Sequence, residues 1–220
     1  MKFSHLFFDL DGTLIDSKPG IFNSVYHTLE KLEIRKDDWP ENLNPFIGPP
    51  LRESFKSLFG FDEDLTEKAT TIYREYYSQT GMNEFTIYPG IREALKQLKD
   101  SGFNLSVVTS KAEQYAIKMV RNAGFSEFIT IVSGCEINGT RSEKAELINY
   151  TLDRLGLQPS KQILMIGDRY HDLRGARITG ISSAAVLYGY GSVSELAAET
   201  PGITIATPIE LAEKIIGATE

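Results

Sequence analysis

The chain has 220 residues, of which 41% are hydrophobic and 24% are charged, proportions that are typical of globular proteins and exclude a disordered or fibrous chain. At roughly 100–200 residues per domain, this length accommodates one large domain, or one domain that carries a smaller insert. Lysine and arginine number 23 and aspartate and glutamate 30, so the net charge is −7, which disfavours general binding to nucleic acid.

Cysteine content and hydropathy bear on the compartment in which the protein works. The single cysteine, Cys135, excludes an internal disulfide and a zinc cluster built on thiolates. The first residues contain only a short apolar run, at 6–8, unlike a signal peptide, and no stretch approaches the roughly 18 apolar residues of a membrane span. We therefore expect a soluble, cytoplasmic protein without membrane contact, as a monomer or homodimer.

Short apolar runs alternate with helical patterns over most of the chain. Residues 5–9 form an apolar run that ends in Asp and Gly, which predicts a buried strand. Further strands are predicted at residues 105–109, 128–132, 162–167 and 183–187, and helices at 91–99, 113–122, 143–155, 173–179 and 209–216. This alternation predicts βα units on a parallel sheet.

Residues 17–83 break this alternation. Apolar residues recur there at helical spacing, interrupted by a loop rich in proline and glycine at 40–50, and no convincing strand is present. We therefore predict an α/β fold with a doubly wound, Rossmann-like parallel-sheet core formed by residues 1–16 and 84–220. The helical segment 17–83 would be a separate domain inserted into this core.

The strongest motif is Asp9-Leu10-Asp11-Gly12-Thr13, directly after the first predicted strand. Side chains two positions apart on an extended segment point the same way, so Asp9 and Asp11 would face the crevice where open α/β sheets bind ligands. Like charges this close need a cation or a raised pKa. Gly12 permits a sharp turn in which neighbouring N–H groups can face an anion. The alternative is a strand that ends in a solvated acidic turn.

Other predicted strands and helices end or begin with groups that suit an anion. The strand that begins at Asn104 ends in Thr109 and Ser110, which offer a hydroxyl group and backbone amides. Lys144 lies at the start of a helix, from which its ammonium group can point toward the edge of the sheet. Taken singly, each of these residues is more often structural than functional.

A third acidic strand end completes the pattern. The strand that ends at Gly167 is followed by Asp168, and Asp172 lies one helical turn later. Together, Asp9, Asp11 and Asp168 would form a hard oxygen site without histidine or cysteine, which suits Mg²⁺.

These residues resemble, in order, the four motifs of the haloacid dehalogenase-like hydrolase superfamily, whose Asp-x-Asp-Gly-Thr pattern marks the phosphohydrolases. The matching positions are Asp9–Thr13, Thr109, Lys144 and Gly167-Asp168 with Asp172. Residues 45–54, 167–176 and 188–191 are similar to the phosphoglycolate phosphatase-like branch, some of whose members are nucleotidases or pyrophosphatases. The resemblance implies that segment 17–83 is the α-helical cap of this family.

The resemblance also implies a mechanism. Asp9 would attack phosphorus and form an aspartyl-phosphate, while Asp11 would protonate the leaving oxygen and then activate water. Mg²⁺ would be held by the side chains of Asp9 and Asp168 and by the backbone carbonyl of Asp11. Asp172 would orient Lys144 or a metal-bound water.

Substrate binding follows from the same resemblance. Thr109 and the Ser110 amide, with the turn at Gly12, would bind phosphoryl oxygens, and Lys144 would neutralise the phosphoryl group and the nucleophile. In the cap, Arg52 is the candidate specificity residue, because its guanidinium could meet a carboxylate or a second phosphate. The roles of Arg169, His171 and Lys111 stay open, and arginine at 169 departs from the acidic or small residue common in the family.

We therefore expect a Mg²⁺-dependent phosphatase that hydrolyses a small phosphate monoester, similar to phosphoglycolate phosphatase. A 5'-nucleotidase, a pyrophosphatase and a sugar phosphomutase of the same superfamily stay open, because they would share the core motifs. From another class, a non-enzymatic binding or regulatory module on this scaffold is disfavoured by the joint presence of Asp9, Asp11, Lys144 and Asp168.

Overall fold

The structure is a computed structural model that describes residues 3–49, 51–137 and 140–219. It divides into two compact units, one formed by Met1–Asp16 and Ile87–Glu220 and the other by Ser17–Thr86. Within the described ranges, every helix is too short or too polar to span a lipid bilayer.

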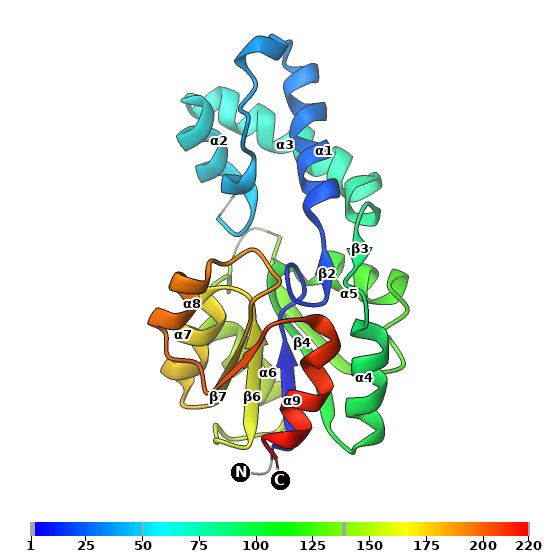
Figure 1. The fold of residues 1–220 in the computed structure, drawn as a ribbon. Coiled ribbons are helices and arrows are strands. Elements are labelled where there is room, and N and C mark those ends of the chain that lie inside the picture. The colour runs from blue at the N-terminus through cyan, green and yellow to red at the C-terminus, as the bar shows by residue number, and fades with distance from the viewer. Residues whose placement is uncertain (1–2, 50, 138–139, 220) are drawn as a thin grey trace. The chain divides into compact units, whose positions relative to one another are not determined.

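A six-stranded parallel sheet forms the centre of the larger unit (Figure 1). Its strand order is β5-β4-β1-β6-β7-β8. The inner strands β1 and β6 are apolar along almost their whole length, because both faces of a parallel sheet are covered. This sheet confirms the predicted doubly wound α/β fold. The strands are β1 (His5–Phe8), β4 (Asn104–Ala112), β5 (Ile129–Cys135), β6 (Ile163–Gly167), β7 (Ser182–Val186) and β8 (Ile203–Ile205).

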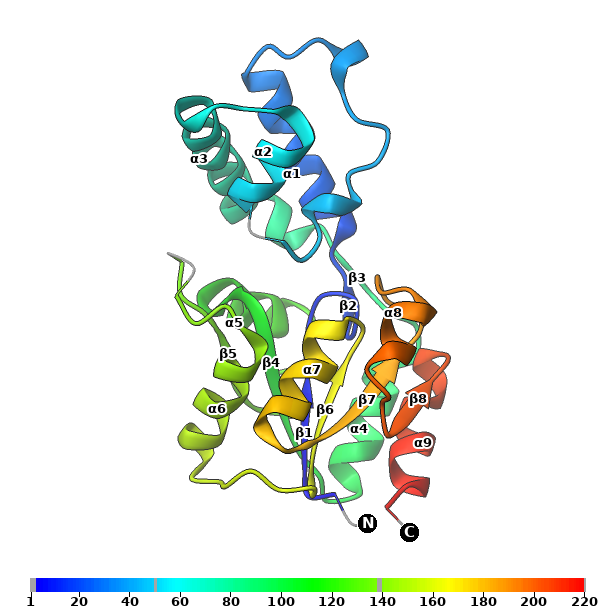
Figure 2. The same cartoon turned by 90° about the vertical axis from the view of Figure 1, so that its left-hand side faces the viewer.

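Helices cover both faces of this sheet (Figure 2). Helices α6, α7 and α8 lie on one face and α4, α5 and α9 on the other. Right-handed crossovers give this arrangement when the chain runs from β1 out to β5 and later from β6 out to β8. The helices are α4 (Ile91–Asp100), α5 (Glu113–Asn122), α6 (Lys144–Leu155), α7 (Tyr170–Thr179), α8 (Val193–Ala198) and α9 (Leu211–Gly217), with a 3-10 helix at Pro208–Glu210.

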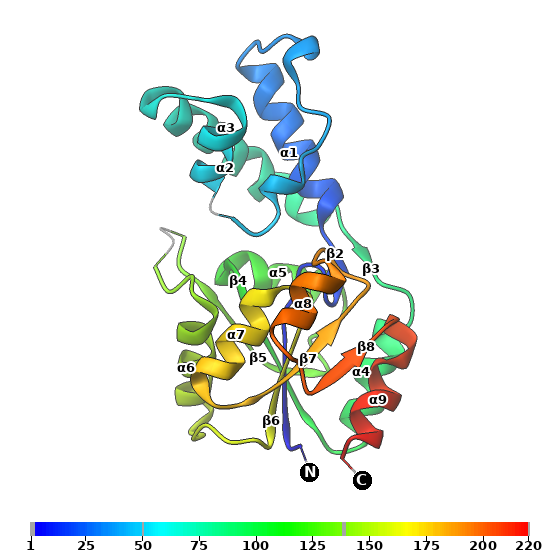
Figure 3. The ribbon, with the colours of Figure 1, turned by 60° about the vertical axis from the view of Figure 1, so that its left-hand side comes forward.

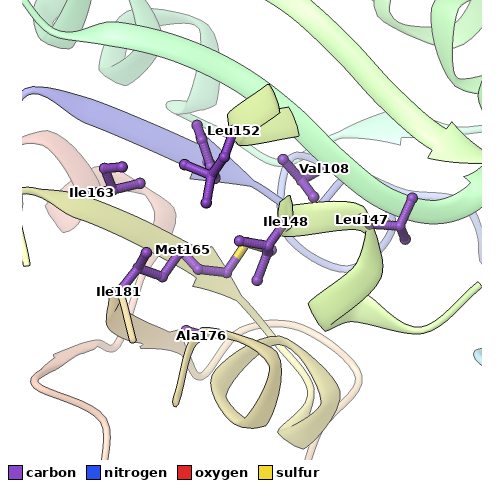
Figure 4. Close-up of a cluster of buried hydrophobic side chains, with 9 residues drawn as sticks. Val108, Leu147, Ile148, Leu152, Ile163, Met165, Ala176 and Ile181 are labelled. Atoms are coloured by element: carbon purple, nitrogen blue, oxygen red, sulfur yellow. The ribbon is translucent and has the colours of Figure 1, made fainter. Parts of the chain in front are cut away.

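A cluster of buried side chains fixes α6 and α7 against the sheet (Figure 4). No member is more than 2% exposed. Truncation of such a side chain to alanine typically costs about 2–5 kcal/mol, so the cluster holds α6, and with it Lys144, at a defined position. The members are Phe7, Val108, Leu147, Ile148, Leu152, Ile163, Met165, Ala176 and Ile181.

The carboxyl ends of β1, β4 and β6 meet where the strand order reverses direction, which is where open α/β sheets bind ligands. Phe8, the last residue of β1, pairs with Val107 of β4 and with Ile166 of β6. The residues that follow these three positions therefore begin at the same level of the sheet. This register brings the predicted motifs of three separate segments to one edge.

The smaller unit is helical and contains α1 (Lys18–Lys31), α2 (Leu51–Phe59) and α3 (Glu63–Gln79) (Figure 3). At its centre, the ring of Phe55 contacts those of Phe46, Phe61 and Tyr73, with centroids 4.9, 6.0 and 6.3 Å away. Helix α3 begins after Asp62, whose side chain accepts a hydrogen bond from the Leu65 N–H at 2.9 Å. Short 3-10 helices lie at Lys36–Asp38, Asn44–Phe46 and Gly81–Asn83, and β2 (Ile15–Asp16) pairs with β3 (Thr86–Ile87).

Some elements differ from the sequence-based expectation. Strand β8 and helix α8 were not predicted, and α8 has only six residues, too few for a helical period to be recognised. Helix α7 begins at Tyr170 rather than Leu173. The reason is that side chains accept the N–H groups at its start, which have no acceptor within the helix. Asp172 accepts the N–H of Arg169, and Glu195 accepts the N–H of Tyr170.

Candidate active site

Asp9 lies directly after β1 and is largely buried. Its backbone N–H donates to the carbonyl oxygen of Ile166 in β6 at 2.9 Å, which fixes the residue at the edge of the sheet. Its Oδ1 accepts a hydrogen bond from Nζ of Lys144 at 3.0 Å. The carboxylate that the sequence marks as the nucleophile is therefore paired with a cation from a distant helix.

Lys144 is the first residue of α6 and is only 5% exposed. Besides Asp9, its ammonium group contacts Oδ1 of Asp172 at 2.8 Å and donates to the carbonyl oxygen of Val108 at 3.1 Å. Burial alone would lower the pKa of Lys144, but Asp172 and Asp9 outweigh burial and hold this pKa above its ordinary value. Lys144 therefore stays positively charged, and Asp172 is in a position to orient it.

Two carboxyl groups at this edge, those of Asp9 and Asp168, have raised pKa values. Burial raises the pKa of Asp9 from 3.8 to about 6, against the effect of Lys144, and the charges of Asp172 and Asp11 add to the rise. Burial, followed by the charges of Asp9 and Asp172, also raises the pKa of Asp168. Such shifts are expected where several carboxylates share a buried site with too little positive charge.

Three of these carboxylates are close enough to hold one metal ion. Oxygen atoms of Asp9, Asp168 and Asp172 all lie within 4.8 Å of one another. The set consists of hard oxygen donors, which Mg²⁺ prefers, and a divalent cation would reduce the repulsion among the three carboxylates. Oδ1 of Asp11 is buried and accepts no hydrogen bond within the part of the chain that is described. The residues present thus fit a divalent metal, with Asp172 as a carboxylate additional to the predicted ligands.

The side chain of Asp11 meets a second lysine. Oδ2 of Asp11 lies 2.9 Å from Nζ of Lys111, and the two side chains are 19% and 10% exposed. The sequence left the role of Lys111 open between a charge at the rim of the phosphate site and a solvated residue at the start of a helix. The structure places it at the predicted acid–base residue.

Gly12 shapes the turn that contains the two aspartates. Its φ is +82°, and its N–H donates to the carbonyl oxygen of Ile15 at 2.8 Å, so this N–H closes the turn. A methyl group on Gly12 would overlap the carboxyl group of Asp168. Glycine therefore lets two motifs approach each other.

The predicted phosphoryl-binding residues, Thr109 and Ser110, lie in the last part of β4. Thr109 is buried, and its Oγ1 accepts a hydrogen bond from the Lys111 N–H at 3.2 Å. The exposed Ser110 donates through its hydroxyl to the carbonyl oxygen of Ser142 at 3.1 Å. This bond connects the Thr109 segment to the segment that precedes Lys144.

Asp168 is fully buried and is supported by residues that sequence reasoning did not assign to the site. Its Oδ2 accepts a hydrogen bond from the Tyr190 N–H at 2.7 Å, and its Oδ1 lies 3.4 Å from the hydroxyl of Thr13. The Tyr188 hydroxyl donates to the carbonyl oxygen of Thr13 at 3.0 Å. The sequence signal for this support was the run 188–191, in which glycine alternates with tyrosine.

Arg52, the predicted specificity residue, lies in the smaller unit at the start of α2. Its guanidinium pairs with the carboxylates of Glu63 and Glu67 on α3. Lys56 pairs with Glu63 as well. A substrate anion would therefore compete with two carboxylates for Arg52, whose role in recognition stays a prediction.

Comparison with known families now adds to this geometry. Residues 6–186 match the sequence model of the haloacid dehalogenase-like hydrolases, a range that includes β1, β4, α6 and β6 with the residues described above. The chain belongs to the haloacid dehalogenase-like hydrolases. The resemblance inferred from its motifs is thereby confirmed.

The relatives that are similar over most of the chain include two named as phosphate-ester hydrolases and one named as a kinase. A 5'-nucleotidase of Pseudomonas aeruginosa is 41% identical and covers 91% of this chain and 90% of its own. The tyrosine-protein kinase PtkA of Mycobacterium tuberculosis is 32% identical over 96% of this chain and 71% of its own, and a phosphoglycolate phosphatase of Vibrio vulnificus is 26% identical over 95% and 94%.

The fold is shared with solved structures at similar identity. A structure from Clostridium difficile whose protein is assigned to the phosphatases has a TM-score of 0.91, with 35% identity over 98% of this chain and 99% of that chain. The chain is thus a phosphatase of the haloacid dehalogenase-like family, as the sequence analysis expected.

Proposed function

We propose that this member of the family is a Mg²⁺-dependent phosphatase that hydrolyses a small phosphate monoester through a phosphorylated Asp9. The observation that carries the proposal is the pairing of the buried Asp9 carboxylate with Lys144 beside Asp168 and Asp172. An ion pair at 3.0 Å stabilises the ionised form of a carboxylate that burial alone would protonate.

In the first step, an oxygen of Asp9 forms a bond to phosphorus while the bond from phosphorus to the leaving oxygen breaks. Asp11 donates the proton that the leaving oxygen takes up. In the second step, Asp11 accepts a proton from water as this water attacks phosphorus, and the bond from phosphorus to Asp9 breaks. Inorganic phosphate leaves, and both aspartates return to their starting states.

The other residues stabilise charge during these steps. Lys144 neutralises part of the negative charge of the phosphoryl group and of Asp9, and Thr109 with the Ser110 amide binds phosphoryl oxygens. Mg²⁺, held by Asp9, Asp168 and the Asp11 carbonyl, would supply further positive charge to the phosphoryl oxygens. Asp172 holds Lys144 between itself and Asp9.

Two substrate classes are favoured by the relatives. The 41% identity to a 5'-nucleotidase over nine-tenths of both chains supports a nucleoside monophosphate as the first substrate to test. The similarity to phosphoglycolate phosphatases, which the motifs already indicated, supports phosphoglycolate as the second. The motif residues act on the phosphoryl group alone, so they favour neither class.

The test is a screen of the purified protein against nucleoside monophosphates, phosphoglycolate, sugar phosphates, pyrophosphate and an aryl phosphate, with Mg²⁺ and with EDTA. Release of phosphate from one of these classes, dependent on Mg²⁺, is the expected result. Isomerised sugar phosphate without free phosphate would indicate a phosphomutase. No turnover of any substrate would contradict the proposal and favour a binding module.

A further inference from the structure

The loop that carries Asp168 is held by a segment from outside the family motifs, residues 188–195. The Tyr190 N–H donates to the Asp168 carboxylate at 2.7 Å. Gly191 packs so closely on the same loop that a methyl group at its Cα would overlap the backbone carbonyl oxygen of Asp168. The segment then continues into α8, which lies beside α7 (Figure 3).

Glu195 of α8 contacts the two residues that follow Asp168, which are Arg169 and Tyr170 at the start of α7. Its Oε1 accepts hydrogen bonds from Nε of Arg169 at 2.8 Å and from the Tyr170 N–H at 3.0 Å. Tyr170 is the first residue of α7, so this N–H has no acceptor within its own helix. A carboxylate at this end of a helix is also favoured by the helix dipole.

These contacts keep Glu195 ionised. Burial works to raise the pKa of Glu195, but the hydrogen bonds from Tyr170 and Arg169 outweigh it and lower the pKa below its ordinary value. The pairing also gives a structural reason for the arginine at 169. Its guanidinium is drawn toward α8, and its backbone N–H donates to Asp172 at 3.2 Å.

We propose that Glu195 is a positioning residue that, through Arg169 and Tyr170, holds the Asp168 loop in the geometry needed for metal binding. This inference rests on the proposed metal site at Asp9 and Asp168. Glu195 lies beyond residues 6–186, which match the family model, and on a helix that the sequence did not predict.

A matched control exists on the same pair of helices. Arg177 of α7 pairs with Glu199, directly after α8, at 2.9 Å. This pair has the same chemistry as Arg169 with Glu195, but it lies at the opposite end of α7 from Asp168. Removal of the Glu199 carboxylate therefore tests whether loosening α8 against α7 is by itself sufficient to weaken Mg²⁺ binding.

The experiment measures the Mg²⁺ dissociation constant by calorimetry without substrate, together with the unfolding temperature of the metal-free protein. Loss of a hydrogen-bond partner of a metal ligand typically weakens metal binding about 10–100-fold, and Glu195 acts one residue further away. We therefore expect Glu195→Ala to raise the dissociation constant about three- to tenfold. Glu195→Gln keeps an acceptor oxygen and should give a smaller rise, and Glu199→Ala should change the constant less than about twofold.

Three results would overturn the inference. One is an unchanged dissociation constant in Glu195→Ala, even with a lower unfolding temperature, and another is an equal rise in Glu199→Ala. The third result applies if Glu195→Ala does not fold, so that Glu195→Gln replaces it. In that case, a Mg²⁺ dissociation constant of Glu195→Gln equal to that of Glu199→Gln would overturn the inference.

Asp168→Asn separates this inference from the proposed function. If the wild type binds no Mg²⁺, or Asp168→Asn binds it equally well, the metal site is wrong and the role of Glu195 falls with it. If Asp168→Asn loses Mg²⁺ binding while the Glu195 variants keep it, only the role of Glu195 is wrong.

Discussion

The charged residues of the sheet edge are mostly buried, whereas those of the helical unit that form ion pairs are exposed. At the sheet edge, Lys144 pairs with Asp9 and Asp172, and Lys111 pairs with Asp11. Asp168 lies beside them and accepts a hydrogen bond from the Tyr190 N–H. These side chains are mostly out of contact with water. In the helical unit, Arg52 and Lys56 pair with glutamates on a surface where each side chain is more than a third exposed.

This difference in burial indicates which of the two regions acts on a charged ligand. Buried charge that is not balanced by neighbours is costly, so its presence at the sheet edge indicates a site that acts on a charged ligand. Exposed ion pairs contribute only about 0–1 kcal/mol to stability and indicate no function by themselves. Substitutions of the buried and of the exposed charged residues should therefore have effects of very different size.

Asp9→Asn should lower turnover at least about a thousandfold, because the amide has nearly the same shape but cannot attack phosphorus. The unfolding temperature of the metal-free protein should not fall, since asparagine has no charge to bury. Steady-state kinetics and thermal unfolding check the two statements. Asp37→Asn, at an exposed position of the helical unit, is the control and should behave as wild type; turnover of Asp9→Asn within tenfold of wild type would contradict the assignment.

Lys144→Ala should destabilise the protein by about 3–5 kcal/mol at pH 8, because it leaves Asp9 and Asp172 as buried carboxylates without their cation. Lys56→Ala, which breaks a surface pair, should cost about 0–1 kcal/mol. Urea unfolding measures both free energies. Equal losses would show that the two regions do not differ in the way described.

Arg52→Ala should lower kcat/KM about tenfold for the best natural substrate, which corresponds to one charge-assisted contact. An aryl phosphate, which offers no second anionic group, should be hydrolysed nearly as well as by the wild type. Lys56→Ala is the matched control, because it removes a neighbouring cation that pairs with the same Glu63. Equal losses on both substrates would assign Arg52 to the stability of the helical unit instead.

Mg²⁺ should raise the unfolding temperature more at pH 7.5 than at pH 5.5. The folded protein binds a proton at Asp9 with a pKa of about 6 against an ordinary value of 3.8, so the stability of the metal-free protein falls as the pH rises through this interval. Mg²⁺ binds the ionised carboxylate and restores the stability that is lost at high pH, whereas at pH 5.5 protons compete with Mg²⁺ for the carboxylate. Thermal unfolding with and without Mg²⁺ measures the effect, and an equal or smaller shift at pH 7.5 would contradict it.

Much of the fold and of the sheet edge could be predicted because the relevant signals are local. Each motif residue follows a short apolar strand, lies in its last part or opens a helix, and parallel topology alone brings such ends together. Gly156 and Gly180 directly follow the predicted helices 143–155 and 173–179, and their φ values of +66° and +78° are those of residues that end a helix. These features need no knowledge of side-chain packing.

The contacts that could not be predicted depend on packing between distant segments. Glu195 reaches Arg169 from a helix of six residues, and Tyr190 reaches Asp168 from a loop without a fixed period. The pair of Lys111 with Asp11 joins the last part of β4 to the turn after β1, where both side chains could equally have pointed to solvent. Periodicity and motif spacing contain no information about such pairs.

The central position of β1 has a consequence for synthesis of the protein. This strand leaves the ribosome well before its hydrogen-bonding neighbours, which are Asn104–Val107 of β4 and Ile163–Ile166 of β6. The apolar His5–Phe8 segment therefore stays without its strand neighbours while the intervening chain is translated. The helical unit, whose contacts are closer in sequence, can fold during this time. Nascent chains that end before β6 should accordingly expose β1 and depend on chaperones, whereas completion of β6 should release them.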